Sequence, residues 1–141
     1  MTSGEKSIAI KCRDEMWKDD SASQHLGMQI DVSEPGKAAA SFTVRDTMVN
    51  GHGVCHGGYI FTLADSAFAF SCNTYNVVTF ASSAAIEFVR PARAGDVLSA
   101  VAEERHRGGR TGIYDVTVTN QGGEVVAIFR GRSHATRSAI L

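Results

Sequence analysis

A glycine-rich loop followed by an apolar helix carries the residues of this chain that could do chemistry. The loop, residues 50–58, reads N-G-H-G-V-C-H-G-G, and apolar or small side chains then recur at helical spacing to about residue 73. The first N–H groups of a helix have no partner within it, so Gly57 presents a donor at the positive end of the helix dipole. Asp65 is the single charged residue of the helix. A carboxylate and a free N–H are groups that activate an attacking oxygen and stabilise an oxyanion.

The helix, predicted over about residues 57–73, has apolar or small residues on every side. Such a helix is usually buried all round, so either the rest of the chain or a second copy of it should cover this one. An ionised carboxylate there is costly unless it is paired, hydrogen-bonded or protonated. Asp65 is therefore either a structural aspartate, satisfied by the backbone or by Asn50, or a functional group.

The elements around this helix are predicted by a change in hydrophobic period along the chain. Apolar residues at i+4 spacing predict an amphipathic N-terminal helix over about residues 7–18. Strict alternation on both sides of Glu34-Pro35-Gly36 predicts a hairpin. Further strands, joined by short turns that indicate an antiparallel meander, are expected over residues 77–89, 97–106, 111–120 and 125–132. The fold class is therefore α+β, with a long central helix wrapped by a curved antiparallel sheet of five to six strands.

Length and composition predict one domain, residues 1–141, with an ordinary soluble composition. The chain has a mass of 15.0 kDa and a formal net charge of −1, which gives no reason to expect a nucleic-acid partner. No apolar run is long enough to suggest a membrane span, and the first residues lack the apolar core of a signal peptide. We therefore expect a cytoplasmic protein without a membrane partner.

The cysteines and histidines do not predict a metal site or a disulfide framework. The chain has three cysteines, none of them in a C-x-x-C pair, so we expect reduced and mostly buried thiols. His52, Cys55 and His56 are close in sequence, but only alternate residues of a loop project together and no fourth ligand is apparent. We expect no metal.

Three motifs together resemble those of the hotdog-fold acyl-CoA thioesterases, and most closely the PaaI-like, phenylacetate-degradation branch. They are the loop with an aspartate eight residues after Gly57, F-V-R-P-A-x-A-G-D at residues 88–96, and R-H-x-G-x-x-T-G-x-Y-D at residues 105–115. The resemblance implies hydrolysis of an acyl-CoA, such as phenylacetyl-CoA or its ring-hydroxylated forms, to free acid and CoA. It also implies a homodimer, usually assembled into a homotetramer, and no cofactor, since coenzyme A is part of the substrate.

The same resemblance implies roles for four residues of the loop and helix. Asp65 would be the general base or the nucleophile, and the Gly57 backbone N–H would polarise the thioester carbonyl. Asn50 and His56 would orient the reacting groups. Eight residues of helix separate Gly57 from Asp65 by about 12 Å, too far for both to reach one carbon. Asp65 should therefore act on a thioester held by Gly57 of a partner subunit.

Substrate-binding residues are expected on two strands and one turn. Related enzymes place a hydroxyl on a strand facing the site, for which Ser82 and Ser83 are both candidates. Phosphates of coenzyme A favour arginine and backbone N–H groups, and Arg90 is one candidate for them. The resemblance places the nucleotide near a turn that combines both kinds of group, made of Arg107, Gly108, Gly109, Arg110 and Thr111.

Two other functions are compatible with such a fold. A non-catalytic acyl-CoA-binding protein would not need a carboxylate on the buried helix, so Asp65 argues against this function. A hotdog hydratase or dehydratase would use a histidine with an acidic residue. The chain offers His56 but lacks the arrangement expected around it.

Overall fold

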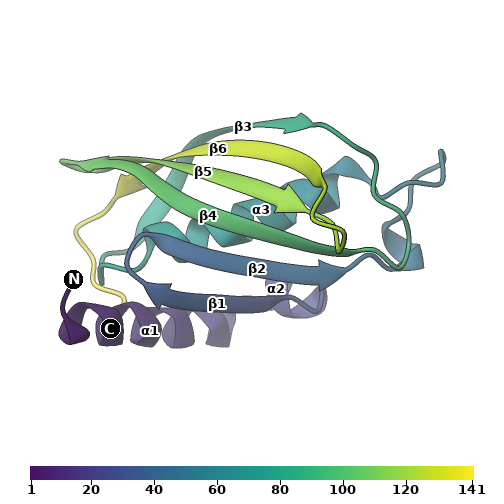
Figure 1. The fold of residues 1–141 in the computed structure, drawn as a ribbon. Coiled ribbons are helices and arrows are strands. Elements are labelled where there is room, and N and C mark those ends of the chain that lie inside the picture. Colours follow the sequence, from purple (N-terminus) through teal and green to yellow (C-terminus); the bar gives the residue numbers. More distant parts are fainter.

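The computed structural model describes the whole chain, residues 1–141, as a single curved antiparallel sheet around one central helix (Figure 1). The central helix, α3, spans Gly57–Cys72. The six strands are β1 (Gln29–Glu34), β2 (Lys37–Thr43), β3 (Thr79–Phe88), β4 (Val97–Gly108), β5 (Thr111–Thr119) and β6 (Val125–Ala135). This is the predicted hotdog arrangement, with the sheet at the upper end of the predicted size.

The strand order is β1-β2-β4-β5-β6-β3, with every pair antiparallel. The hairpin β1–β2 and the meander β4–β5–β6 match the prediction, but β3 was expected beside β4 and instead pairs with β6 at the sheet edge. The segment between β3 and β4 is not a hairpin turn. The Cys55 N–H donates to Ala92 O at 2.7 Å, and the Gly95 N–H donates to Val44 O at 2.8 Å. These bonds carry the segment across the sheet end to β2, where β4 begins.

Two helices precede the sheet, and a third short helix follows β2. Helix α1, Ser3–Asp19, begins earlier than predicted because Thr2 and Glu5 form a capping box at its start. It runs beside β1 at the other edge of the sheet from β3 (Figure 1). Helix α2, Ser21–His25, is capped by Asp20, and the 3-10 helix η1 spans Asp46–Met48. No helix of the structure is both long and apolar enough to cross a bilayer.

The core lies between the concave face of the sheet and one side of α3. Phe68 is fully buried there, with its ring centroid 5.6 Å from that of Tyr114 and 5.8 Å from that of Phe129. Burial of an aromatic side chain of this size contributes about 1.5–3 kcal/mol. Gly131 of β6 lies directly under the Phe68 ring, so the strand can approach the helix closely.

One flank of α3 is only partly covered by the chain, with Phe61 at its edge packed against Phe129 at a ring-centroid distance of 5.4 Å. Gly58 is exposed, and Phe61, Thr62, Asp65 and Ala69 are half-buried, although the sequence predicted a helix buried on every side. These five residues recur at i+3 and i+4 spacing, so they form one stripe along the helix, here called the open stripe. The sequence allowed either the rest of the chain or a second copy of it to cover this helix. The chain itself leaves the open stripe partly exposed.

Replacing Gly131 with alanine should destabilise the fold. A Cβ on this residue would lie 2.7 Å from Cε2 of Phe68, closer than atoms pack, so the helix or strand must shift. We expect Gly131→Ala to lower the free energy of unfolding by about 1–3 kcal/mol, measured by denaturant titration. The control is Gly51→Ala, whose Cβ would have no neighbour within 4 Å. Equal stability of the two variants would contradict this account of the core.

Candidate active site

The loop before α3 is held closed by Asn50. Asn50 Oδ1 accepts hydrogen bonds from the N–H of His52 at 2.9 Å and of Val54 at 3.3 Å. The Asn50 N–H donates to Val54 O at 2.8 Å, and the His56 N–H donates to Met48 O at 2.7 Å. Asn50, predicted to orient reacting groups, thus has its amide oxygen engaged by the loop backbone. Its direct effect is to fix the loop that delivers the start of α3.

The N-terminus of α3 presents the donor that the sequence predicted. The Nδ1 atom of His56 accepts from the Gly58 N–H at 2.9 Å, so a neutral His56 carries its proton on Nε2. The Gly57 N–H has no hydrogen-bond partner in the chain. A groove of about 300 Å³ passes Gly57, lined also by Val54, Cys55, Ile60, Phe88, Val89, Arg90 and Pro91. The structure therefore brings a free N–H to the wall of an apolar groove.

Phe88 is a residue of this groove that sequence reasoning missed. It is 54% exposed at the end of β3, and a Cβ on Gly57 would lie 3.0 Å from its ring. The only sequence signal was an aromatic residue inside the F-V-R-P-A-x-A-G-D motif, which does not reveal contact with a residue on another element. Arg90, also on the groove, forms an ion pair with Glu124 at 3.3 Å, so its guanidinium is already partly neutralised.

Asp65 lies on the open stripe without a partner. Its carboxylate makes no hydrogen bond or ion pair within the chain, and burial raises its pKa above the ordinary value of 3.8. Within the chain, neither Asn50 nor the backbone satisfies the Asp65 carboxylate, as they would if Asp65 were a structural aspartate. A carboxylate with a raised pKa is also a better base, which suits general-base chemistry near neutral pH.

One chain does not bring Gly57 and Asp65 together. Helix α3 is unbroken from Gly57 to Cys72, so its rise places the two residues about 12 Å apart along the axis. No single carbon lies within reach of both.

The candidate serines of β3 lie at a β-bulge between Ala81 and Ser83. Ser83 pairs with the exposed Arg132, whereas Ala81 pairs with the buried Ser133 and Ala84 with the buried Gly131. Because directly paired residues share a face, Ser83 belongs to the outer face of the sheet. Ser82 Oγ donates to Arg132 O at 3.1 Å. Beside the bulge, the positions that face α3 are therefore alanines, Ala81 and Ala84, and both serines are exposed on the edge strand.

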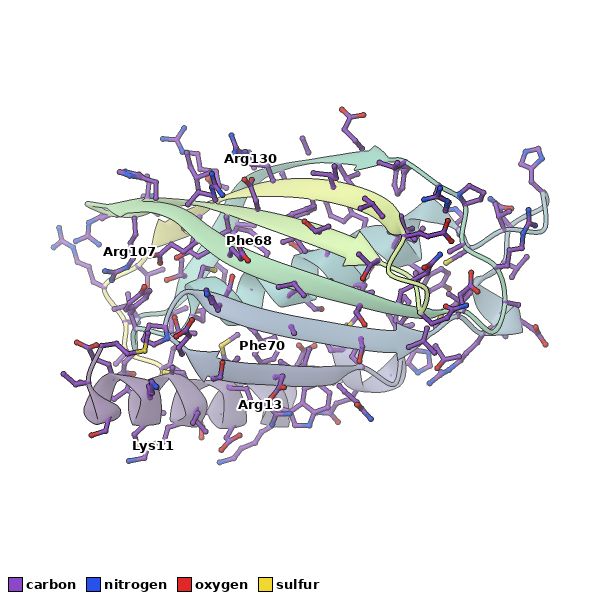
Figure 2. All side chains as sticks on the ribbon, viewed as in Figure 1. Lys11, Arg13, Phe68, Phe70, Arg107 and Arg130 are labelled. Carbon is purple, nitrogen blue, oxygen red and sulfur yellow. The ribbon has the colours of Figure 1, made fainter.

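The turn 107–111 joins β4 to β5 at the opposite end of the molecule from the loop before α3 (Figure 1). Figure 2 shows Arg107 at this end. Arg110 Nη1 donates to the carbonyls of Ala135 and Thr136 at 3.5 and 3.4 Å, and Thr111 Oγ1 donates to Gly108 O at 3.4 Å. Gly109 adopts φ +60°, a left-handed conformation that favours glycine. The turn borders a small hollow that Cys72 also lines, so it lies near the C-terminal end of α3.

The potential metal ligands do not form a cluster. No three histidine, cysteine or acidic side chains are placed to hold one ion. The three cysteines are free and buried, as predicted, and burial raises the pKa of Cys55 to about 11 and that of Cys72 to about 12. These thiols are therefore protonated at neutral pH.

A central helix wrapped by one curved sheet, with a free N–H at its start and an unpaired carboxylate on its open stripe, defines a hotdog-fold thioesterase. The family model of the thioesterase superfamily matches residues 52–127, and the chain belongs to this superfamily. It is 45% identical over 119 residues to the acyl-coenzyme A thioesterase PaaI of Escherichia coli, covering 84% of this chain and 85% of the relative.

Solved structures agree with this assignment. The structure of the E. coli PaaI protein from the phenylacetic acid degradation operon matches with a TM-score of 0.93 at 41% identity, covering 95% of this chain and 97% of that one. A hypothetical thioesterase from Streptococcus pneumoniae, solved with coenzyme A, matches with a TM-score of 0.75 at 26% identity, over 79% and 90% of the two chains. The chain is therefore PaaI-like within its superfamily.

Replacing Asp65 with asparagine should abolish thioester hydrolysis without destabilising the protein. The folded state keeps the Asp65 proton to a higher pH than the unfolded chain, so ionisation lowers stability as pH rises above 3.8. The variant removes this penalty, so its melting temperature at pH 7 should equal or exceed that of the parent, and the difference should vanish near pH 3. We expect kcat to fall at least about 10³-fold. A clearly lower melting temperature at pH 7 would instead show a structural aspartate.

Proposed function

We propose that the protein hydrolyses acyl-CoA thioesters to the free acid and coenzyme A, with aryl- or arylacetyl-CoA such as (hydroxy)phenylacetyl-CoA as substrate. The observation that carries the proposal is the Asp65 carboxylate, half-buried on the open stripe and without a partner in its own chain. The acyl-CoA thioesterase activity of the E. coli relative supports the reaction. The apolar groove beside Gly57, with the Phe88 ring in its wall, supports an aromatic acyl group.

The active site is completed by a second copy of the chain. Gly57 and Asp65 are about 12 Å apart on one helix. The Gly57 N–H of one subunit therefore binds the thioester on which the Asp65 carboxylate of the other subunit acts. A two-fold axis then generates two equivalent sites. The open stripe and the exposed edge strand β3, which carries the exposed Phe80 and Phe88, are surfaces that such a dimer would cover. A pair of these dimers forms the proposed homotetramer.

In the proposed reaction, the thioester oxygen accepts a hydrogen bond from the Gly57 N–H, which strengthens as negative charge develops on it. Asp65 either takes a proton from the attacking water or attacks the carbon itself to form an acyl anhydride that water then hydrolyses. In both routes the carbon–sulfur bond breaks, and the sulfur leaves as a thiolate that is protonated to free coenzyme A. His56 and the loop held by Asn50 keep the start of α3 in place.

The nucleotide end of the substrate is proposed to reach the turn 107–111. Cys72 ends α3 beside this turn. Asp65 lies seven residues before Cys72, which is about 10 Å along the helix axis. A thioester at Asp65 can therefore extend its coenzyme A arm toward the turn of the same chain. Arg90 lies at the other end, on the Gly57 groove, and is proposed to contact the acyl end of the substrate.

Release of free thiol from a panel of acyl-CoA substrates tests the reaction. We expect arylacetyl-CoA to give a kcat/KM at least about tenfold above that of short-chain acyl-CoA, since differences of one group in a pocket are worth about 1–3 kcal/mol. The rate should fall at acid pH, with a midpoint above 3.8 because the pKa of Asp65 is raised. Binding without thiol release would indicate a non-catalytic acyl-CoA-binding protein. Conversion of an enoyl-CoA without thiol release would indicate a hydratase.

A mixed dimer tests the shared site. One chain carries Asp65→Asn and the other Gly57→Ala, in which the added Cβ would lie 3.0 Å from the Phe88 ring and obstruct the approach to the N–H. One of the two sites then keeps both native groups, so about half of the parent activity should return. Each variant homodimer, inactive by itself, is the control. No recovery in purified mixed dimers, isolated through two different tags, would show that the site lies within one chain.

A further inference from the structure

Strand β4 contains a bulge that changes the direction of Arg107. The register between β4 and β5 shifts between Glu104, which pairs with Tyr114, and His106, which pairs with Ile113. Arg107 then pairs with Gly112. Tyr114 and Gly112 are buried on the α3 side of the sheet, and directly paired residues share a face. The bulge therefore puts Arg107 on the same face as Glu104, where regular alternation would have put it on the opposite one.

On that face Arg107 stacks on Tyr75, one of two tyrosines whose hydroxyls donate to Glu104. Its guanidinium carbon lies 3.8 Å from the centroid of the Tyr75 ring. Glu104 Oε1 accepts from the Tyr75 hydroxyl at 2.8 Å and from the Tyr114 hydroxyl at 2.9 Å. Burial and the Glu104 carboxylate raise the pKa of Tyr75 to about 12, so its hydroxyl remains a donor. A carboxylate at the hydroxyl also makes the ring face more negative, which favours the stacked cation.

The stacked guanidinium is held without using its N–H groups. Arg107 forms no ion pair in the chain, unlike Arg90, Arg105 and Arg130. It borders two hollows, one shared with Arg110, Thr111 and Cys72 and one of about 500 Å³ lined also by Met1, Glu5, Ile8, Pro35, Thr74 and Tyr75. A planar guanidinium that is stacked on an aromatic ring and has free donors matches the geometry of a phosphate group.

We propose that Tyr75, Glu104 and Tyr114 are positioning residues that hold the Arg107 guanidinium ready to bind a phosphate of the coenzyme A nucleotide. The inference rests on the proposed function, because it assigns the partner of Arg107 to that substrate. Glu104 does not touch the substrate; it fixes the Tyr75 ring, and the ring fixes the cation. The larger hollow beside the stack leaves room for the nucleoside on the α1 side of Arg107.

Calorimetric titration with coenzyme A and with pantetheine, which lacks the nucleotide, tests the proposal independently of turnover. Arg107→Ala should weaken coenzyme A binding about tenfold or more and leave pantetheine binding unchanged, because only the nucleotide carries phosphates. Tyr75→Leu, which removes the ring, should have a similar effect. Tyr75→Phe keeps the ring but loses the bond to Glu104, so a smaller effect of about threefold is expected.

Arg13→Ala is the matched control, because Arg13 stacks at 5.3 Å over Trp17 on α1. Figure 2 shows Arg13 on α1 and Arg107 at the end of the β4–β5 hairpin. This control should change neither dissociation constant. Equal binding of coenzyme A by the parent and Arg107→Ala would overturn the inference, and so would an equal loss for pantetheine. Absence of thiol release with intact, Arg107-dependent binding would contradict the proposed hydrolysis but not the role of Arg107.

Discussion

The packing of α3 against the concave face of the sheet is the interaction on which the rest of the structure depends. Phe68 between Tyr114 and Phe129, with Gly131 beneath it, fixes how far the helix stands from the strands. Because one side of the helix is fixed in the core, the direction in which its other residues face is fixed too. Asp65 must lie on the open stripe, Gly57 must begin the helix at the groove, and Cys72 must end it near the turn 107–111.

Local chemistry made most of the fold predictable from the sequence. Alternation with Pro35-Gly36 predicted β1 and β2, and the glycine-rich loop predicted the start of α3 at the observed residue. The placement of β3 was missed because it depends on bonds between distant segments, such as Cys55 to Ala92. The capping box at Thr2 lengthened α1 beyond the amphipathic pattern, since a cap adds residues that need no apolar face.

In the candidate site, too, features set by local sequence could be predicted, and features set by contacts between distant segments could not. The free N–H of Gly57 and the unpaired carboxylate of Asp65 could be predicted because each is a property of a single position on one helix. The contact of Phe88 with Gly57, the outward position of Ser83 and the Glu104 network could not be read from spacing, because each depends on strand register. A bulge of one residue reverses the face that regular alternation predicts for every residue beyond it. The sequence carries no strong signal of where a bulge falls.

The bulge in β4 also bears on how such a hairpin could diverge between relatives. Because it consists of one extra residue, deleting Arg105 would restore regular pairing and leave Arg107 opposite Gly112, on the face of Glu104. The bulge thus absorbs the extra residue locally, and Arg107 keeps its face while every other strand keeps its place. A hairpin of this kind can thus gain or lose one codon at the bulge without moving the cation at the entrance of the site and without any substitution in the core.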